Sequence, residues 1–130
     1  MKIFDQKDPW TYKVNFVDEN NVVLGYDMEQ SCCEDANWTV LDEEPIDKIS
    51  YFDDLFRKNQ EPEDYEGFVF DKTYMKDLVL EGGDEGSAVC FKMVKESEEK
   101  FIVVYNAHNG YYSHGFEFKD NDETLREDYI

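Results

Sequence analysis

Residues 88–105 read Ala88-Val89-Cys90-Phe91-Lys92-Met93-Val94, then a charged run over Lys95–Glu99, then Phe101-Ile102-Val103-Val104-Tyr105. β-Branched and aromatic side chains favour strands because they pack well on a pleated surface. A short polar run between two such segments favours a turn. The region therefore predicts a β-hairpin with a charged tip.

Two further hairpins are predicted from the same kind of pattern. Within residues 11–27, Tyr12, Val14 and Phe16 alternate with polar residues before Asp18–Asn21, and Val22 to Tyr26 forms the returning segment after it. The short run Asp18–Asn21 favours a turn because asparagine tolerates left-handed backbone. Nearer the C-terminus, Asn109-Gly110 is the strongest local hairpin signal in the chain and leads into a strand over 111–118.

Helical spacing is found in two segments. Apolar residues recur at three- and four-residue intervals over 46–58, at Ile46, Ile49, Phe52, Leu55 and Phe56. This spacing predicts one amphipathic helix. Ser31 and Glu34 have the spacing of a capping box, which predicts a short helix from Cys32 to about Trp38.

These elements together predict an α+β fold with a mostly antiparallel sheet of five to seven strands and one or two short helices. Phe68-Val69-Phe70 is expected to form one of the short strands. The 130 residues fit one domain, 1–130, because the chain is too short for two ordinary cores. The acidic C-terminal tail, 119–130, is expected to be loosely held.

The formal net charge is −19, and it is spread along the chain. Residues 1–60 carry 14 acidic and 6 basic residues, or −8, and residues 61–130 carry 18 and 7, or −11. Such a field repels nucleic acid and anionic membranes and attracts basic protein surfaces or cations. The alternative is that the charge only keeps the protein soluble.

The sequence predicts a cytoplasmic protein. No run approaches the roughly 18 apolar residues of a membrane span, and Met1–Asp5 lacks the apolar core of a signal peptide. Three cysteines, two of them adjacent, do not form a disulfide framework, which agrees with a reducing compartment.

A zinc site is one hypothesis for the cysteines and histidines. Its candidate ligands, two thiolates and two imidazoles, are Cys32, Cys33, His108 and His114, with Cys90 a poor substitute in a strand predicted as core. Adjacent cysteines are unlike the usual zinc spacing, since neighbouring side chains diverge on a strand or a helix. The alternatives are a small buried cysteine beside Trp38 and a histidine-bearing tight turn.

No enzyme motif is present, and we expect a protein that is not an enzyme. The sequence has no glycine-rich phosphate loop, nucleophile elbow or paired-histidine helix. A cysteine at 32 or 33 could in principle pair with His108 as thiolate and imidazolium, but the spacing does not place them together. Basic patches with interleaved aromatics are absent, which disfavours direct nucleic-acid binding.

Two acidic clusters are the candidate partner-binding residues. The first lies in a proline- and glycine-bounded loop, at Glu61, Glu63, Asp64 and Glu66, and the second at the tip of the 88–105 hairpin, at Glu96, Glu98 and Glu99. Binding residues concentrate in loops on a rigid scaffold. The alternative is that these acids only solvate the loop tips.

The sequence resembles an uncharacterised family of small phage and bacterial proteins. The resemblance rests on Glu29–Glu34, on Phe52-Asp53-Asp54-Leu55-Phe56 and on Asn109-Gly110-Tyr111-Tyr112-Ser113. Members share an adjacent cysteine pair followed by glutamate, an Asp-Asp-Leu stretch and a C-terminal Asn-Gly-Tyr-Tyr-Ser. The chain departs at His114, where relatives carry an acidic residue. The resemblance implies a phage or mobile-element setting and no mechanism.

Three functions follow as hypotheses. The first is a non-catalytic, anti-CRISPR-like inhibitor that blocks a basic nucleic-acid-binding surface of a host defence nuclease, because dense acid can replace phosphate charge. The second is a small zinc-binding module. The third is an immunity protein that neutralises a basic toxin through charge complementarity, and gene neighbourhood would distinguish it from the first.

Overall fold

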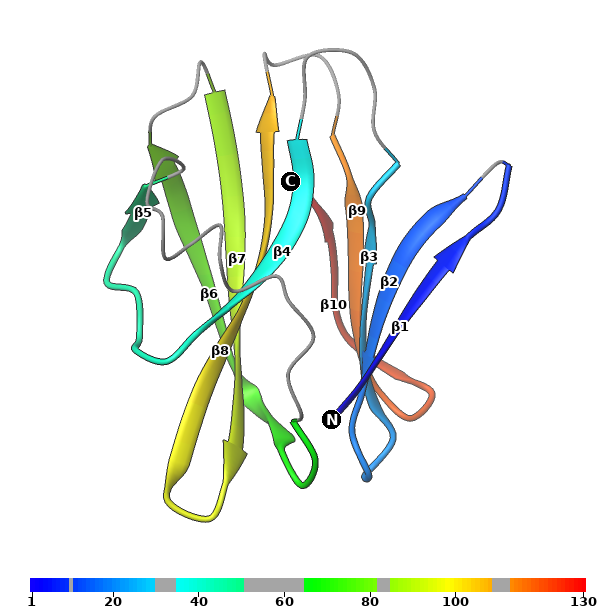
Figure 1. Ribbon diagram of the computed structural model, residues 1–130, viewed down its shortest axis with the longest axis vertical. Helices are drawn as coiled ribbons and strands as arrows, with labels where there is room; N and C mark the ends of the chain where they lie inside the picture. Colours follow the sequence, from blue (N-terminus) through cyan, green and yellow to red (C-terminus); the bar gives the residue numbers. More distant parts are fainter. Residues whose placement is uncertain (10, 30–34, 51–64, 82–84, 109–112) are drawn as a thin grey trace.

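The computed structural model describes residues 1–9, 11–29, 35–50, 65–81, 85–108 and 113–130. Within these ranges the chain forms ten strands and no helix. The strands make two five-stranded sheets that face one another across a shared apolar core (Figure 1).

Sheet A has the strand order β1-β2-β3-β9-β10, and all its neighbouring strands are antiparallel. Its strands are β1 (Lys2–Lys7), β2 (Tyr12–Val17), β3 (Val22–Asp27), β9 (Gly115–Asp120) and β10 (Glu123–Tyr129). The hairpin predicted over 11–27 is confirmed as β2 and β3. Its turn contains a left-handed asparagine, Asn21, with a φ of 60°.

Sheet B has the order β4-β8-β7-β6-β5, antiparallel except for the parallel pair β5 and β6. Its strands are β4 (Asp35–Leu41), β5 (Lys48–Ser50), β6 (Val69–Glu81), β7 (Glu85–Lys95) and β8 (Glu98–His108). The hairpin predicted from residues 88–105 is confirmed and is longer than expected. Its turn is tight, because Lys95 already pairs with Glu98.

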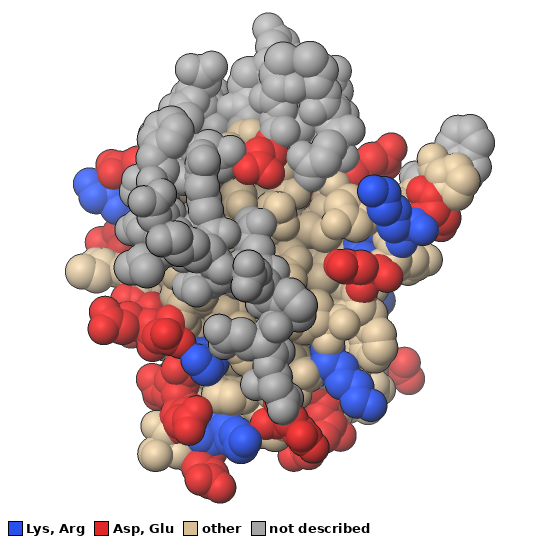
Figure 2. All heavy atoms as spheres, in the orientation of Figure 1, with Lys and Arg blue, Asp and Glu red and all other residues tan. Residues whose placement is uncertain are grey.

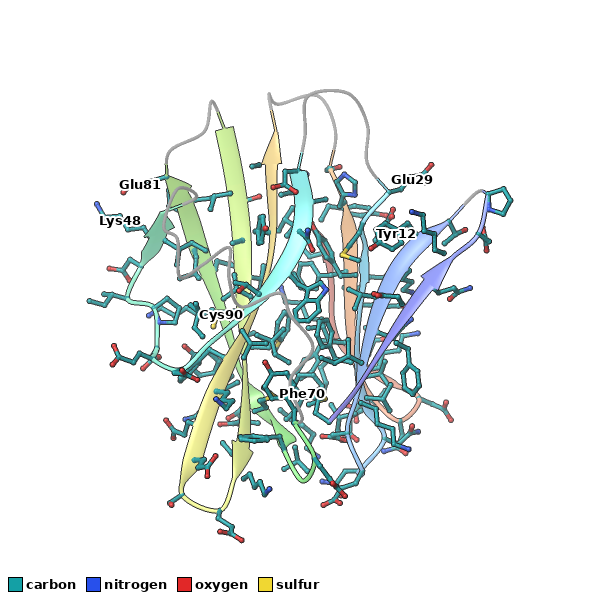
Figure 3. The ribbon with its side chains drawn as sticks, viewed as in Figure 1. Tyr12, Glu29, Lys48, Phe70, Glu81 and Cys90 are labelled. Atoms are coloured by element: carbon teal, nitrogen blue, oxygen red, sulfur yellow. The ribbon has the colours of Figure 1, made fainter. Side chains whose placement is uncertain are left out.

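Alternating side chains from both sheets fill the core between them. Phe16 of sheet A meets Trp38 of sheet B edge to face, with ring centroids 5.2 Å apart. Phe70 of sheet B, which is labelled in Figure 3, lies edge to face with Phe118 of sheet A, with ring centroids 5.1 Å apart. Large rings in these geometries stabilise the sandwich through buried area and through edge-to-face attraction.

The outer face of sheet B carries a second apolar cluster, formed by Leu78, Leu80, Ala88, Cys90, Phe101, Val103 and Tyr105. Residues 44–45 are tied to this face by two hydrogen bonds. The Tyr74 hydroxyl donates to the Glu44 carboxylate at 2.7 Å, and the Lys76 ammonium donates to the Pro45 carbonyl at 3.0 Å. Sheet B therefore carries apolar clusters on both faces.

The predicted α+β class is wrong for the part of the chain that the structure describes, which is all-β. The helix expected from Cys32 to Trp38 is one source of the error, because residues 35–41 form β4. Ala36, Trp38 and Val40 all point into the core, which is the two-residue period of a strand. Residues 30–34 lie outside the described ranges.

The second predicted helix, over 46–58, is replaced at its start by β5. Ile49 pairs with Leu80 of β6 and packs on the outer cluster, while Ile46 is 77% exposed. These two side chains therefore do not share the apolar helical face that the spacing predicted. Residues 51–58 lie outside the described ranges.

The C-terminal tail is not loosely held, because residues 123–129 form β10 along β9. Ile130 is buried and exchanges two backbone hydrogen bonds with His114, at 2.7 and 2.9 Å. The strand expected over 111–118 begins at Gly115, and the predicted Asn109-Gly110 turn lies outside the described residues. In the described ranges we find no helix of the length and apolar character that crossing a membrane requires.

Candidate functional site

Three hairpin turns and one loop lie together at the lower end of the sandwich (Figure 1). They connect β2 to β3, β7 to β8 and β9 to β10, and the loop is residues 65–68, before β6. We call this region the turn end. Its exposed acidic residues are Glu19, Glu66, Glu96, Glu98, Asp122 and Glu123.

A buried carboxylate organises the β2–β3 turn. Asp18 is 6% exposed, and its Oδ1 accepts hydrogen bonds from the backbone N–H groups of Asn20 and Val22, both at 2.9 Å. Its Oδ2 accepts a third bond, at 2.8 Å, from the N–H of Phe70 in sheet B. Bonds from amides to a charged acceptor are strong, so Asp18 fixes this turn against the opposite sheet.

The β2–β3 and β9–β10 turns are joined directly. The N–H of Asn121 donates to the carbonyl of Asn21 at 3.1 Å, and the Asn121 amide reaches the Asn20 carbonyl at 3.4 Å. Lys72 of sheet B pairs with Asp120 at 2.8 Å. The hydrogen bond from Lys72 lowers the pKa of Asp120 and raises that of Lys72. The turn end is therefore cross-linked between sheets.

The 65–68 loop is held from two sides. The N-terminal ammonium of Met1 donates to the Tyr65 carbonyl at 2.8 Å. On the other side, the Lys95 ammonium lies 5.9 Å from the Phe68 ring centroid, and its methylenes pass over Gly67. Gly67 has a φ of 85°, a backbone conformation that glycine adopts readily. Glu66 is thus presented beside the β7–β8 turn.

Most acids of the turn end have no basic partner in the described part of the chain. No ion pair to a described lysine, arginine or histidine is formed by Glu19, Glu96, Glu98, Asp122 or Glu123. Figure 2 shows acidic side chains crowding the lower part of the molecule, with basic side chains between some of them. A hollow of about 370 Å³ opens here, lined by Met1, Lys2, Glu19, Glu66, Gly67 and Phe68.

The predicted acidic clusters are brought together only in part. Glu66 and the pair Glu96 and Glu98 are exposed at the turn end. Glu99 belongs to β8 and forms a 3.0 Å ion pair with Lys92, so its charge is partly neutralised. Glu61, Glu63 and Asp64 lie outside the described residues.

Three residues of this site were not among the predicted candidates. Glu19 lies in a turn that the sequence does predict, so its exposure follows from that turn. Asp122 and Glu123 were missed because the chain after residue 119 was expected to be loose. Their signal is Asn121-Asp122, a polar pair that permits a tight turn between two alternating segments.

The predicted zinc ligands are only partly described. Cys32, Cys33 and the side chain of His108 lie outside the described part of the structure. His114 is 4% exposed, and its Nδ1 lies 3.0 Å from the carbonyl oxygen of Asp27. Because a carbonyl can only accept, Nδ1 carries the proton. No group of three or more histidine, cysteine or acidic side chains that could hold a metal occurs within the described residues.

Cys90 is buried in the outer cluster of sheet B, on the opposite side of the sheet from Phe70 (Figure 3). Burial raises the pKa of its thiol to about 12. The thiolate needed for metal binding or nucleophilic attack is therefore scarce at neutral pH. This agrees with the prediction that Cys90 belongs to the core.

A second hollow, also of about 370 Å³, lies on the outer face of sheet A. Its lining includes Gly25 and Gly115, which have no side chain of their own. Lys13 passes over Gly25 and pairs with Glu117 at 3.1 Å. Tyr129, 68% exposed, lies against Gly115. This hollow is separate from the turn end.

Comparisons of the chain with protein-family models, with curated proteins and with solved structures give no match.

Proposed function

We propose that this chain is a non-catalytic binding protein whose acidic turn end blocks a basic nucleic-acid-binding surface of another protein. One observation carries the proposal. Exposed acids from three turns that are far apart in the sequence, represented by Glu19, Glu96 and Asp122, converge on one end of the sandwich. None of these three has an ion-pair partner among the described residues.

Physical reasons favour a basic protein surface as the partner. A groove that binds nucleic acid is lined with lysine and arginine, and a surface dense in carboxylates supplies the charge that phosphates would otherwise supply. The turn end is rigid because Asp18 and Asn121 cross-link it. A preorganised surface loses less conformational entropy on binding than a flexible one does.

The proposed partner class is a host defence nuclease, which makes the protein anti-CRISPR-like and places the interaction in the cytoplasm. The phage or mobile-element setting comes from the sequence resemblance alone.

The experiment compares two triple charge reversals. The first variant, Glu19→Lys with Glu96→Lys and Glu98→Lys, changes the turn end. The control, Glu29→Lys with Glu43→Lys and Glu127→Lys, changes three exposed acids elsewhere. Each variant changes the net charge by six units, from −19 to −13, so only the position of the charge differs.

The measurement has two steps. Affinity capture from a host lysate identifies nucleic-acid-handling proteins, and fluorescence polarisation then measures displacement of labelled DNA from the captured protein. We expect the wild type and the control to displace DNA and the turn-end variant to fail. Equal displacement by both variants would move the interface elsewhere, and capture of no nucleic-acid-handling protein would contradict the proposal.

A zinc-binding module is the second candidate, and the surroundings of His114 favour it. Metal-binding histidines usually donate their second ring N–H to a carbonyl or carboxylate, and Nδ1 of His114 has this arrangement with Asp27. Asp35, next to the 30–34 segment, pairs with Ala107, next to His108. The described neighbours of all four predicted ligands therefore lie at one end of the sandwich.

The zinc candidate has a direct test. Elemental analysis of protein purified without an affinity tag should give about one zinc per chain, and a chelator should lower the melting temperature by several degrees. A Cys32→Ser/Cys33→Ser variant should lose both the zinc and the response to chelator. A metal content below about 0.1 per chain would reject this candidate and leave the acidic-inhibitor proposal unaffected.

A further inference from the structure

Strand β6 bulges out of its sheet close to the turn end. Its register with β7 is regular up to Phe70 and resumes at Met75. Between these residues β6 has four positions, 71–74, whereas β7 has one, Lys92. Figure 1 shows the ribbon of β6 bending here, near its lower end. A bulge of this kind can re-aim the side chains that it contains.

Side-chain hydrogen bonds brace the bulge. Oδ1 of Asp71 accepts from the Thr73 hydroxyl at 2.7 Å and from the backbone N–H of Thr73 at 3.0 Å. These two bonds lower the pKa of Asp71, so its carboxylate is ionised at neutral pH. Hydrogen bonds to a charged acceptor are stronger than those to a neutral one. Lys72, which lies between these two residues in the sequence, therefore extends from a braced segment of backbone.

Lys72 crosses from sheet B to sheet A. Its ammonium forms an ion pair with Oδ2 of Asp120, the last residue of β9, at 2.8 Å. Oδ1 of the same carboxylate accepts from the side-chain amide of Asn121 at 2.9 Å. The backbone N–H of Asn121 in turn donates to the Asn21 carbonyl at 3.1 Å. Lys72 thus begins a continuous chain of contacts that ends in the β2–β3 turn.

Two positions of β6 therefore anchor the two turns of sheet A that belong to the turn end. The N–H of Phe70 donates to Asp18 at 2.8 Å, which fixes the β2–β3 turn that carries Glu19. Lys72, two residues further on, holds the start of the β9–β10 turn, which carries Asp122. Sheet B thus supports both acidic turns from a single strand.

A lysine in this place reduces the charge of a surface whose proposed role depends on acidity. The hydrogen bond to Asp120, together with the nearby charges of Asp120 and Glu123, raises the pKa of Lys72, so its ammonium is charged at neutral pH. We propose that Lys72 is a positioning residue of the turn end, which holds the β9–β10 turn so that Asp122 is presented in a fixed place relative to Glu19. This inference rests on the proposed function.

Charge and position predict opposite results when Lys72 is replaced. Lys72→Gln removes one positive charge, which changes the net charge from −19 to −20, and leaves Asp120 without this ion pair. If only the amount of negative charge matters, the variant should bind a basic surface more tightly. If Lys72 positions the turn, the variant should bind less tightly, because a less ordered surface loses more conformational entropy on binding. We expect the second result, a loss of roughly twofold to fivefold in affinity, which is the range that an exposed ion pair can supply.

The first experiment needs no partner. Amide hydrogen exchange of the full chain, followed by NMR, reports how often the bond from the Asn121 N–H to the Asn21 carbonyl opens. Lys72→Gln should raise the exchange rate of the Asn121 amide by roughly twofold to fivefold. Lys72→Arg, which can keep an ion pair with Asp120, should restore the wild-type rate.

Lys48→Gln is the matched control. It makes the same change in net charge and removes a 3.1 Å ion pair with Glu81, at the opposite end of β6, in which both side chains are more than half exposed. This variant should leave the exchange rate of the Asn121 amide unchanged.

The second experiment measures binding, through displacement of labelled DNA from the captured protein. Lys72→Gln should need roughly twofold to fivefold more protein than the wild type for half displacement, whereas Lys48→Gln should need no more than the wild type. Displacement by Lys72→Gln that equals or exceeds that of the wild type would overturn the proposal, and so would a wild-type exchange rate at Asn121. A wild type that captures no nucleic-acid-handling protein would contradict the proposed function, and the exchange rate would still decide whether Lys72 holds the turn.

Discussion

The carboxylate of Asp18 accepts a hydrogen bond from the backbone N–H of Phe70, a residue 52 positions away, at 2.8 Å. This bond joins the β2–β3 turn of sheet A to the start of β6 in sheet B. The same carboxylate also satisfies two amides of its own turn. One buried side chain thus positions both Glu19 and the strand that follows the Glu66 loop.

Replacing Asp18 should destabilise the protein more than the small size of the aspartate side chain implies. Asp18→Ala removes the acceptor of three backbone hydrogen bonds. Two of these, from the N–H groups of Val22 and Phe70, are buried. An unsatisfied buried amide costs about 1–3 kcal/mol, so we expect a loss of about 3 kcal/mol in urea unfolding. Asp122→Ala, an exposed acid in the β9–β10 turn, should change stability by less than about 0.5 kcal/mol. Equal effects of the two changes would contradict this account of Asp18.

Glu96 lies in the left-handed region, with a φ of 55°, in the tight β7–β8 turn. Two other hairpin turns, β2–β3 and β9–β10, place asparagine at their left-handed positions, Asn21 and Asn121. Asparagine tolerates this backbone better than glutamate does. Glu96→Asn should therefore raise stability by roughly 0.5–1 kcal/mol, seen as a higher melting temperature. Glu98→Asn removes the same charge at a residue without a left-handed backbone and should give no such gain.

The pair Lys13 and Glu117 predicts a specific loss of stability in acid. The hydrogen bond from Lys13 lowers the pKa of Glu117 below its usual value near 4.5. A carboxyl with a lower pKa in the folded state stabilises the protein above its unfolded pKa. That contribution is lost as the pH falls through the folded pKa. Below about pH 4.5, Lys13→Met should therefore lose less stability per pH unit than the wild type.

The control for this pH effect is Lys48→Met. It changes the net charge equally but removes an ion pair to Glu81 in which both side chains are more than half exposed. Lys48→Met should keep the wild-type slope of melting temperature against pH. Parallel slopes for the wild type and both variants would show that Lys13 has no special part in acid stability.

Cys90 should be unreactive in the folded protein. Its thiol is fully buried, and burial raises its pKa to about 12. A reagent therefore cannot reach the sulfur, and little of the thiol is ionised at neutral pH. A Cys32→Ser/Cys33→Ser variant leaves Cys90 as the sole thiol. At pH 8 this variant should react with a thiol reagent only after denaturation, as counted by mass spectrometry. Rapid labelling without denaturant would mean that the outer cluster of sheet B opens easily.

The hairpins could be predicted from the sequence because their signals are local. The alternation of Tyr12–Phe16 with the polar run Asp18–Asn21 after it, and the apolar runs of 88–105, each predict two strands and the turn between them. The same reasoning failed over 35–41, where the capping-box spacing of Ser31 and Glu34 competed with the two-residue alternation of Ala36, Trp38 and Val40. Tertiary packing decided between these signals, since only a strand lets all three side chains reach sheet A.

Strand β6 shows a second reason why the sequence predicts only part of the fold. The prediction was a short strand at Phe68–Phe70, but the strand runs on to Glu81 through the polar residues Asp71–Lys72. Its register with β7 slips between Phe70 and Met75, and no sequence pattern marks such a bulge. The turn end could be predicted only in part for a similar reason, because its members meet through strand order and not through sequence proximity.

The strand order of sheet A also determines when the sheet can close. Strand β3 pairs with β9, and all five strands of sheet B lie between them in the sequence. A ribosome adds about 5–20 residues per second, so β9 is made on the order of 5–20 seconds after β3. During that interval, the β3 edge that later pairs with β9 has no hydrogen-bonding partner, and the apolar face of β1, β2 and β3 is not yet covered by the complete sandwich. Non-local pairing of this kind folds slowly. Completion of the native state is therefore limited by the arrival of residues 115–129, whatever the intrinsic speed of the hairpins made earlier.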